Sequence, residues 1–335
     1  MKEIVRISVK VATPRDLVKI EQIRSNATSG EQLAKIIFLA IQKRGLLIGS
    51  VLNQIIPVRS SERIVFVARR AGELEGFIDI NVPKESLFIS SNPSRWEIQD
   101  IWLQFGSERH SEVLSEMLKT VSAHAIAKGV ERIFARVPAS DPLIDELKRA
   151  GFKQYALENI YVAKHPRCLC RSEHLNIRPA CPADKAALYH LYKKVTPQGV
   201  IEVEAPNVKE WELTYRDTFA QIGQRKARGR HFILATPEVV GWGCLYNPDG
   251  YGTYELCIKT VPDNEIASDI VDYALRDLHG RDDVQVVCTL RHYEFYLSGA
   301  LVERGFERVG SDILLVKELM AREKLKERVL VPQFG

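Results

Sequence analysis

The sequence predicts an α/β fold class, with mixed sheets of the α+β kind, in which one plan is used twice. Residues 9–16 (VKVATPRD) return as residues 177–184 (IRPACPAD) near the start of the second half. Residues 147–152 (LKRAGF) return as residues 301–306 (LVERGF) near its end. The copies lie much farther apart than the period of about 20 to 50 residues in solenoid repeats. We therefore predict two whole domains in tandem.

Length and composition fit this division. The chain has 335 residues, about two domains at the usual 100 to 200 residues each. With 45% hydrophobic and 27% charged residues, it falls outside the disordered class. We expect domains at residues 1–163 and 175–317, a linker at 164–174 and a tail at 318–335.

The first half combines hydrophobic patterns of period 2 and period 3.6. A strand at 4–11 precedes a helix after Pro14, a helix at 31–44, strands at 63–68, 74–80 and 96–103, a helix at 108–128, a strand at 132–137, a helix at 142–150 and a strand pair at 152–163. Residues 70–73 join the first two of the three central strands as a hairpin. Val113, Met117 and Val121 have helical spacing, and Gly129 ends that helix.

The second half repeats this order. We predict a strand at 175–179, a helix at 183–195, strands at 231–236, 239–246 and 252–260, a helix at 264–279, a strand at 284–290, a helix at 292–304 and a strand at 306–316. Gene duplication explains the shared plan. Each domain should be a twisted mixed sheet flanked by helices.

Three short motifs recur at matching places. They are the Pro-x-Asp at 14–16 and 182–184, an acidic residue at the start of the central strand (Glu97 and Glu255), and the terminal Gly-Phe at 151–152 and 305–306. With the element order, these motifs resemble the GNAT superfamily of acyl-CoA-dependent N-acetyltransferases. The resemblance covers residues 4–163 and 175–317. It implies transfer of an acetyl group from acetyl-CoA, as co-substrate, to a small-molecule or protein amine.

The resemblance also implies a loop of the form [RQ]-x-x-G-x-[GA], whose backbone N–H groups hold the cofactor's pyrophosphate at a helix N-terminus. The corresponding first-half segment has glutamine and glycine at a different spacing, with Glu108 beside the expected anion. Residues 262–268 of the second half contain no glycine. The candidate cofactor-binding residues are Gln104, Gly106, Ser107 and Ser268.

Carboxylates on the central strands are candidate general bases. In the superfamily, such a carboxylate often takes a proton from the substrate amine, and Glu97 and Glu255 occupy matching positions. Asp100 is a weaker candidate on the same strand as Glu97. A single acidic residue at the start of a strand is also typical of a solvated or ion-paired surface group.

A proton donor is missing where the resemblance expects one. Many relatives carry a tyrosine five residues before the phenylalanine of Gly-Phe, and here these positions hold Leu147 and Leu301. Leucine cannot donate a proton. Tyr296, on the same predicted helix as Leu301, is the candidate substitute if the helix register differs, and aromatic packing is the alternative role.

Charge and targeting signals narrow the possible partners. The formal net charge of +4 gives no general nucleic-acid footprint, so nucleic acid is not an expected partner. The start of the chain does not resemble a signal peptide. The apolar stretch at 35–58 is interrupted before reaching the ~20 residues of a membrane span. We therefore expect a cytoplasmic protein with no membrane association; a homodimer or a protein partner stays open.

Two clusters have alternative interpretations. Residues 165–174 contain two cysteines and two histidines, but their C-x-C spacing is not that of a zinc knuckle. We predict an ordered linker there and no metal. The basic run at 225–231 fits a solvated loop or a phosphate contact.

The altered loops and missing tyrosines leave two functions open. The first is acetyl transfer to an amine. The second is a catalytically inactive binding or scaffolding protein built on two such domains.

Overall fold

The computed structural model describes most of the chain. The described residues are 6–27, 61–83, 95–104, 110–169, 176–204, 207–208, 211, 229–247, 252–278, 280–281 and 284–319. They belong to two compact units, which we call unit 1 (residues 1–23, 47–134 and 317–335) and unit 2 (24–46 and 135–316). Each unit is described by itself. The predicted helix at 31–44 lies outside the described residues.

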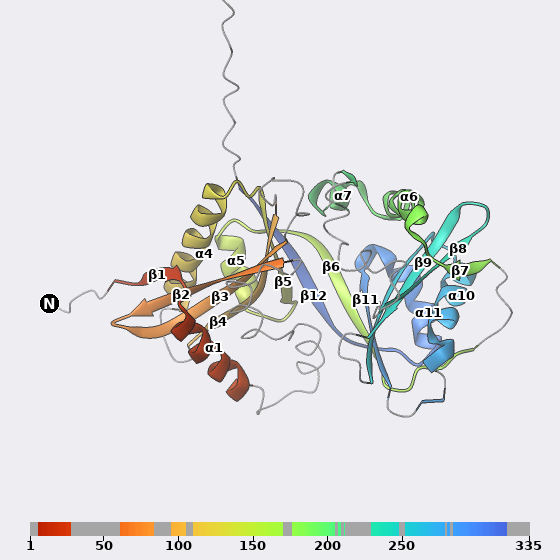
Figure 1. The fold of residues 1–335 in the computed structure, drawn as a ribbon, viewed down its shortest axis with the longest axis horizontal. Coiled ribbons are helices and arrows are strands. Elements are labelled where there is room, and N and C mark those ends of the chain that lie inside the picture. Colours follow the sequence, from red (N-terminus) through yellow and green to blue (C-terminus); the bar gives the residue numbers. More distant parts are fainter. Residues whose placement is uncertain are drawn as a thin grey trace, which may run out of the picture. The chain divides into compact units, whose positions relative to one another are not determined.

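Unit 1 is a sheet with helices against its strands (Figure 1). Its elements are β1 (Ser8–Val11), α1 (Pro14–Ala27), β2 (Ser61–Arg70), β3 (Glu73–Pro83), β4 (Arg95–Leu103), α4 (His110–Ala127) and β5 (Arg132–Pro138), whose last residues belong to unit 2. The strand order is β1-β2-β3-β4-β5. Ala71 and Gly72 turn the β2–β3 hairpin with φ values of 49° and 85°, which suit glycine best.

Alternating side chains on the strands of unit 1 face two helices. Val65, Val67 and Phe77 share a buried cluster with Leu17 and Ile20 of α1. On the opposite face, the Phe66 and Trp96 rings lie 5.4 and 5.9 Å from the ring of His124, on α4. The predicted periods of 2 and 3.6 residues are confirmed here, because both faces of the sheet are covered.

Strand β4 contains a β-bulge. Asp79 of β3 lies opposite Asp100, but the next residue, Ile80, lies opposite Ile98. Gln99 is therefore the extra residue, which bends the strand and re-aims nearby side chains.

Unit 2 contains the longer sheet. Its elements are α5 (Leu143–Arg149), β6 (Lys153–Ala163), β7 (Ile177–Pro179), η1 (Pro182–Asp184), α6 (Lys185–Val195), α7 (Gln198–Glu204), β8 (Gly229–Ala235), β9 (Val239–Tyr246), β10 (Thr253–Thr260), α10 (Asn264–Leu275), η2 (Arg276–Leu278), β11 (Gln285–Arg291), η3 (His292–Leu297), α11 (Ser298–Glu303) and β12 (Glu307–Glu318). The strand order is β12-β6-β11-β10-β9-β8-β7.

Strand β6 lies between strands that come from the other half of the sequence. It pairs antiparallel with β12 from Lys153 to Val162 and with β11 from Glu158 to Ala163. The expected strand pair at 152–163 is wrong, because one uninterrupted strand is needed to reach both neighbours. The compact units therefore cut across the sequence halves. The domain boundaries drawn from the repeat stay a prediction.

The Pro-x-Asp motif has the same structural role in both halves. Asp16 accepts hydrogen bonds from the Thr13 N–H and hydroxyl, both at 2.7 Å, and pairs with Arg69. Asp184 accepts the Cys181 N–H at 2.8 Å and pairs with Arg178 at 2.6 Å. Each carboxylate satisfies a backbone donor at the start of a helix.

The first part of the linker is hydrogen-bonded to a buried ion pair between α10 and the end of α11. Arg304 Nε and Nη2 donate to both oxygens of Asp272 at 2.8 and 2.7 Å, with the two residues 0% and 3% exposed. The Leu169 N–H donates to Asp272 at 2.9 Å, and the Arg167 N–H donates to the Arg304 carbonyl at 3.0 Å. The end of the linker that is described is therefore ordered.

Candidate functional site

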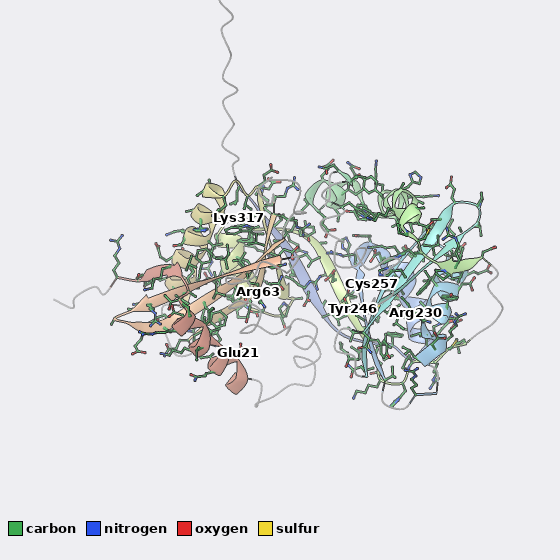
Figure 2. The ribbon with its side chains drawn as sticks, viewed as in Figure 1. Glu21, Arg63, Arg230, Tyr246, Cys257 and Lys317 are labelled. Atoms are coloured by element: carbon green, nitrogen blue, oxygen red, sulfur yellow. The ribbon has the colours of Figure 1, made fainter. Side chains whose placement is uncertain are left out.

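A polar cluster lies on the α1 side of the sheet in unit 1. It consists of Arg63, Asp79, Asn81, Arg95 and Glu97 on β2, β3 and β4, and Figure 2 labels Arg63. Arg63 forms an ion pair with the fully buried Asp79. Arg95 Nη2 donates to Glu97 Oε1 at 2.7 Å, and Asn81 Nδ2 lies 3.5 Å from Glu97 Oε2.

Glu97 is the more accessible carboxylate of this cluster. Its side chain is 31% exposed, whereas that of Arg95 is 7% exposed. The Arg95 guanidinium lies 4.3 Å from the centre of the Phe134 ring, which fixes its position by a cation–π contact. Glu97 therefore presents an anchored carboxylate beside the Gln99 bulge. Asp100 is half-buried beyond the bulge.

The first-half cofactor residues are only partly described. Gln104 is exposed, and its N–H donates to the Glu75 carbonyl at 2.9 Å. Gly106 and Ser107 lie outside the described residues. Helix α4 begins after them at His110, whose ring nitrogen contacts the Gln104 carbonyl. The structure therefore does not test the predicted cofactor contacts.

In unit 2, strands β10 and β11 separate part-way along their length. Residues 253–256 of β10 pair in parallel with residues 285–288 of β11. Beyond them, residues 257–260 and 289–291 of the two strands are not paired with each other. β10 stays paired with β9 over this stretch, and β11 stays paired with β6.

Side chains from η3 reach the end of β10. The Tyr296 hydroxyl donates to the Thr260 carbonyl, and Lys259 pairs with Glu294. Burial raises the pKa of Tyr296, although its hydrogen bond to Thr260 opposes the shift. Tyr296 is therefore a protonated hydroxyl engaged with the backbone. A role as proton donor stays a prediction.

Glu255 lies in the opposite part of β10. It is half-buried and opposite Tyr246 of β9. Glu97 and Glu255 thus occupy corresponding strands, as the repeat predicts. Catalysis by either one stays a prediction.

The N-terminus of α10 already holds a carboxylate. Asp263 Oδ1 accepts the N–H groups of Glu265 and Ile266 at 2.9 and 3.1 Å. These are the free donors that a phosphate would otherwise use. Ser268 lies one turn further along, where its carbonyl accepts Arg304 Nη2 at 3.2 Å. Its predicted cofactor contact is untested.

Leu147 and Leu301 are fully buried in the helices that end at Gly-Phe. They are apolar core residues.

Sequence reasoning missed a charged row in unit 2. Its members are Arg136 on β5, Asp312 on β12, Glu158 on β6, Arg291 on β11 and Glu204 on α7. Arg136 Nη2 and Arg291 Nε each lie 3.0 Å from an oxygen of Glu158, and Arg291 Nη2 lies 2.8 Å from Glu204 Oε1. Burial raises the pKa of Glu158, but the charges of Arg136, Arg291 and Lys259 outweigh it and the net shift is downward.

One signal could have located this row. Ala156 and Ile160, the alternate neighbours of Glu158 on the strand, are apolar, which indicates that Glu158 shares a buried face, and a buried carboxylate requires a cation. The sequence does not show which arginine that is, because the partners lie on other strands.

The part of the chain that the structure describes has neither a metal-binding cluster nor a membrane-spanning helix. It contains no group of three or more histidine, cysteine or acidic side chains arranged to hold a metal ion. Of the linker cluster at 165–174, only 165–169 is described. None of the described helices has the length and apolar character needed to span a bilayer.

Comparison with known proteins gives similarity of structure alone. No protein-family model matches the sequence, and no curated protein is significantly similar to it. A tandem GNAT protein from the clavulanic acid biosynthesis pathway matches over 94% of this chain and 99% of its own, with 12% identity and a TM-score of 0.52. A GCN5-related N-acetyltransferase from Sphaerobacter thermophilus matches over 93% and 96%, with 10% identity and a TM-score of 0.53.

A third match is a region of a larger fungal enzyme. It is a GCN5-related glucosamine N-acetyltransferase region in a multi-domain β-N-acetylglucosaminidase, with 12% identity and a TM-score of 0.59. The match covers 94% of this chain and 38% of that one. Sequence identities this low show that the fold is shared, and they say nothing about the chemistry. The repeated motifs, the mixed sheets and these matches together show that the chain has the tandem GNAT fold.

Proposed function

We propose that this chain is an acyl-CoA-dependent N-acyltransferase whose chemistry takes place in the first half, with acetyl-CoA as co-substrate. The observation that carries the proposal is the anchored, accessible carboxylate of Glu97 on the central strand of unit 1. The fold adds support, since its solved examples include proteins named as N-acetyltransferases.

In this proposal, Glu97 accepts a proton from the ammonium group of the acceptor. The neutral amine nitrogen then attacks the thioester carbonyl, a C–N bond forms, and the C–S bond breaks. The attacking nitrogen loses its second proton to solvent. The leaving thiolate takes its proton from solvent, because Leu147 and Leu301 cannot donate one. Arg95 holds the Glu97 carboxylate in place through the 2.7 Å hydrogen bond.

The second half has a supporting role in this proposal. The Asp263 carboxylate uses two backbone donors at the start of α10, and a phosphate brought there would meet a like charge. We therefore place acyl-CoA at the first-half segment that contains Gln104, Gly106 and Ser107. Variants of Glu255 and Ser268 test the alternative that the base and the cofactor site lie in the second half.

Calorimetry with acetyl-CoA tests the binding step. We expect one molecule bound per chain, and stabilisation by about 2.7 kcal/mol at 100 times the Kd. Gly106→Asp should abolish binding by adding a charged side chain beside the phosphates, whereas Ser268→Asp should leave it unchanged. Absence of binding at millimolar acetyl-CoA would contradict the proposal and favour the inactive binding or scaffolding protein, which the occupied α10 terminus also supports.

A further inference from the structure

Two buried carboxylates of the charged row face each other across a strand pair. Asp312 on β12 lies directly opposite Glu158 on β6, and the residues are 2% and 4% exposed. Like charges at opposed positions destabilise a strand pair. The repulsion is stronger where water is excluded.

The arginines of the row are bound to Glu158. Arg136 and Arg291 each approach one of its oxygens at 3.0 Å. Asp312 Oδ2 is buried, and none of the residues that the structure describes forms a hydrogen bond with it. A buried acceptor without a donor costs free energy, and a proton on Asp312 would remove that cost.

We propose that the Asp312–Glu158 pair is a proton-binding site that regulates how tightly β12 holds β6. With a proton, Asp312 carries no charge and its hydroxyl can donate to Glu158. Without it, two anions oppose each other and the strand pair loosens. These strands come from different halves of the sequence, so proton release weakens the attachment of the first half's last strand.

The surrounding charges determine the pH at which this occurs. Burial raises the pKa of Asp312 to about 6, Glu158 adds to the rise, and Arg136 opposes it. The outer groups are Arg291, which faces Glu158 from β11, Glu204 on α7, which pairs with Arg291, and Tyr155 on β6, hydrogen-bonded to Glu204.

Proton linkage gives the direction in which stability changes with pH. Asp312 has a higher pKa in the folded chain than the ordinary value of 3.8, so the folded state binds the proton more tightly. The stabilisation is complete below about pH 4 and is lost as the pH rises through about 6.

The test compares thermal unfolding of the full chain and of Asp312→Asn between pH 4.5 and about 8. Glu307→Gln, an exposed site on the same strand, is the matched control. The Tm of the wild type should fall relative to that of Asp312→Asn by about 3 °C or more across this range. Glu307→Gln should follow the wild type. Parallel curves for the wild type and Asp312→Asn would overturn the proposal.

Two further measurements apply even if Asp312→Asn folds poorly. The Asp312 carboxyl carbon of the wild type, followed by 13C NMR, should titrate near pH 6, and titration near 3.8 would refute the site. Glu158→Gln should move that titration to lower pH, because the opposing charge is removed and Arg136 is released. An unchanged midpoint would show that the pair is not coupled.

Discussion

Strands β4 and β10 have matching places in the repeat, but their surroundings differ. β4 is bulged at Gln99 and carries an accessible Glu97 held by Arg95. β10 is regular against β9, and the helix after it begins with an Asp263 carboxylate bound to its own backbone. The two halves share the strands and the Pro-x-Asp helix starts, while the polar surroundings of β4 and β10 differ.

The largest expected effect tests this difference directly. Glu97→Gln should lower the rate of amine acetylation by about 10² to 10⁴, the range for loss of a general base. Glu255→Gln should leave the rate within a few-fold of the wild type. Steady-state kinetics with a panel of amines measures both. If Glu255→Gln causes the larger loss, the working half is the second.

The next effect tests whether unit 2 supports the fold without taking part in the chemistry. Asp272→Asn leaves the buried Arg304 charge with only the exposed Glu303 carboxylate, at 3.6 Å, and breaking a buried ion pair costs about 3 to 5 kcal/mol. Urea unfolding measures this loss, while the rate per folded molecule should stay unchanged. Glu146→Gln, which removes an exposed pair with Arg149, should cost less than about 1 kcal/mol. Equal losses from both variants would contradict the structural role.

The two Pro-x-Asp motifs should respond alike to acid. Burial acts to raise the pKa of Asp16, but the Arg69 and Thr13 hydrogen bonds outweigh it and lower the pKa to about 2. The Arg178 hydrogen bond likewise lowers the pKa of Asp184. Both depressed pKa values stabilise the fold above about pH 4. The contribution of Asp16 is lost as the pH falls through about 2, and that of Asp184 is likewise lost in acid.

Asp16→Asn and Asp184→Asn should each cost about 1 kcal/mol near neutral pH. The pH dependence contributed by the replaced carboxylate should disappear in each variant, as measured by urea unfolding between pH 2 and about 7. If only one variant loses acid sensitivity, the two motifs no longer have equivalent roles.

The smallest effect concerns the α10 terminus. Asp263→Ala removes the cap and should destabilise unit 2 by about 1 kcal/mol. Calorimetry should still find one acetyl-CoA per chain, because residues 261–264 contain no glycine to admit a phosphate. A second bound acetyl-CoA would show that the Asp263 charge alone prevents binding at the start of α10.

Local patterns predicted the elements well. The strand expected at 239–246 is β9, and the helix expected at 264–279 appears as α10 followed by η2. The helix expected at 292–304 is divided into η3 and α11, with non-helical backbone at Glu294. The Glu294 carboxylate accepts the Arg291 N–H at 2.9 Å and pairs with Lys259, tertiary contacts that helix propensity does not contain.

Long-range pairing was not predictable. Residues 152–163 have the composition of a strand pair, and only their neighbours on β11 and β12 make them one strand. The charged row was missed for the same reason, since Glu158 meets Arg136 and Arg291 across other strands. Two of the predicted cofactor residues, Gly106 and Ser107, lie outside the described residues.

The placement of β6 also limits how this gene can evolve. Loss of residues 1–163 would leave β11 at a sheet edge and β12 with no neighbouring strand, and exposed strand edges promote aggregation. Loss of the second half would leave β6 without both of its partners. The two copies can therefore diverge in their sites, but we expect neither half to fold stably when it is encoded without the other.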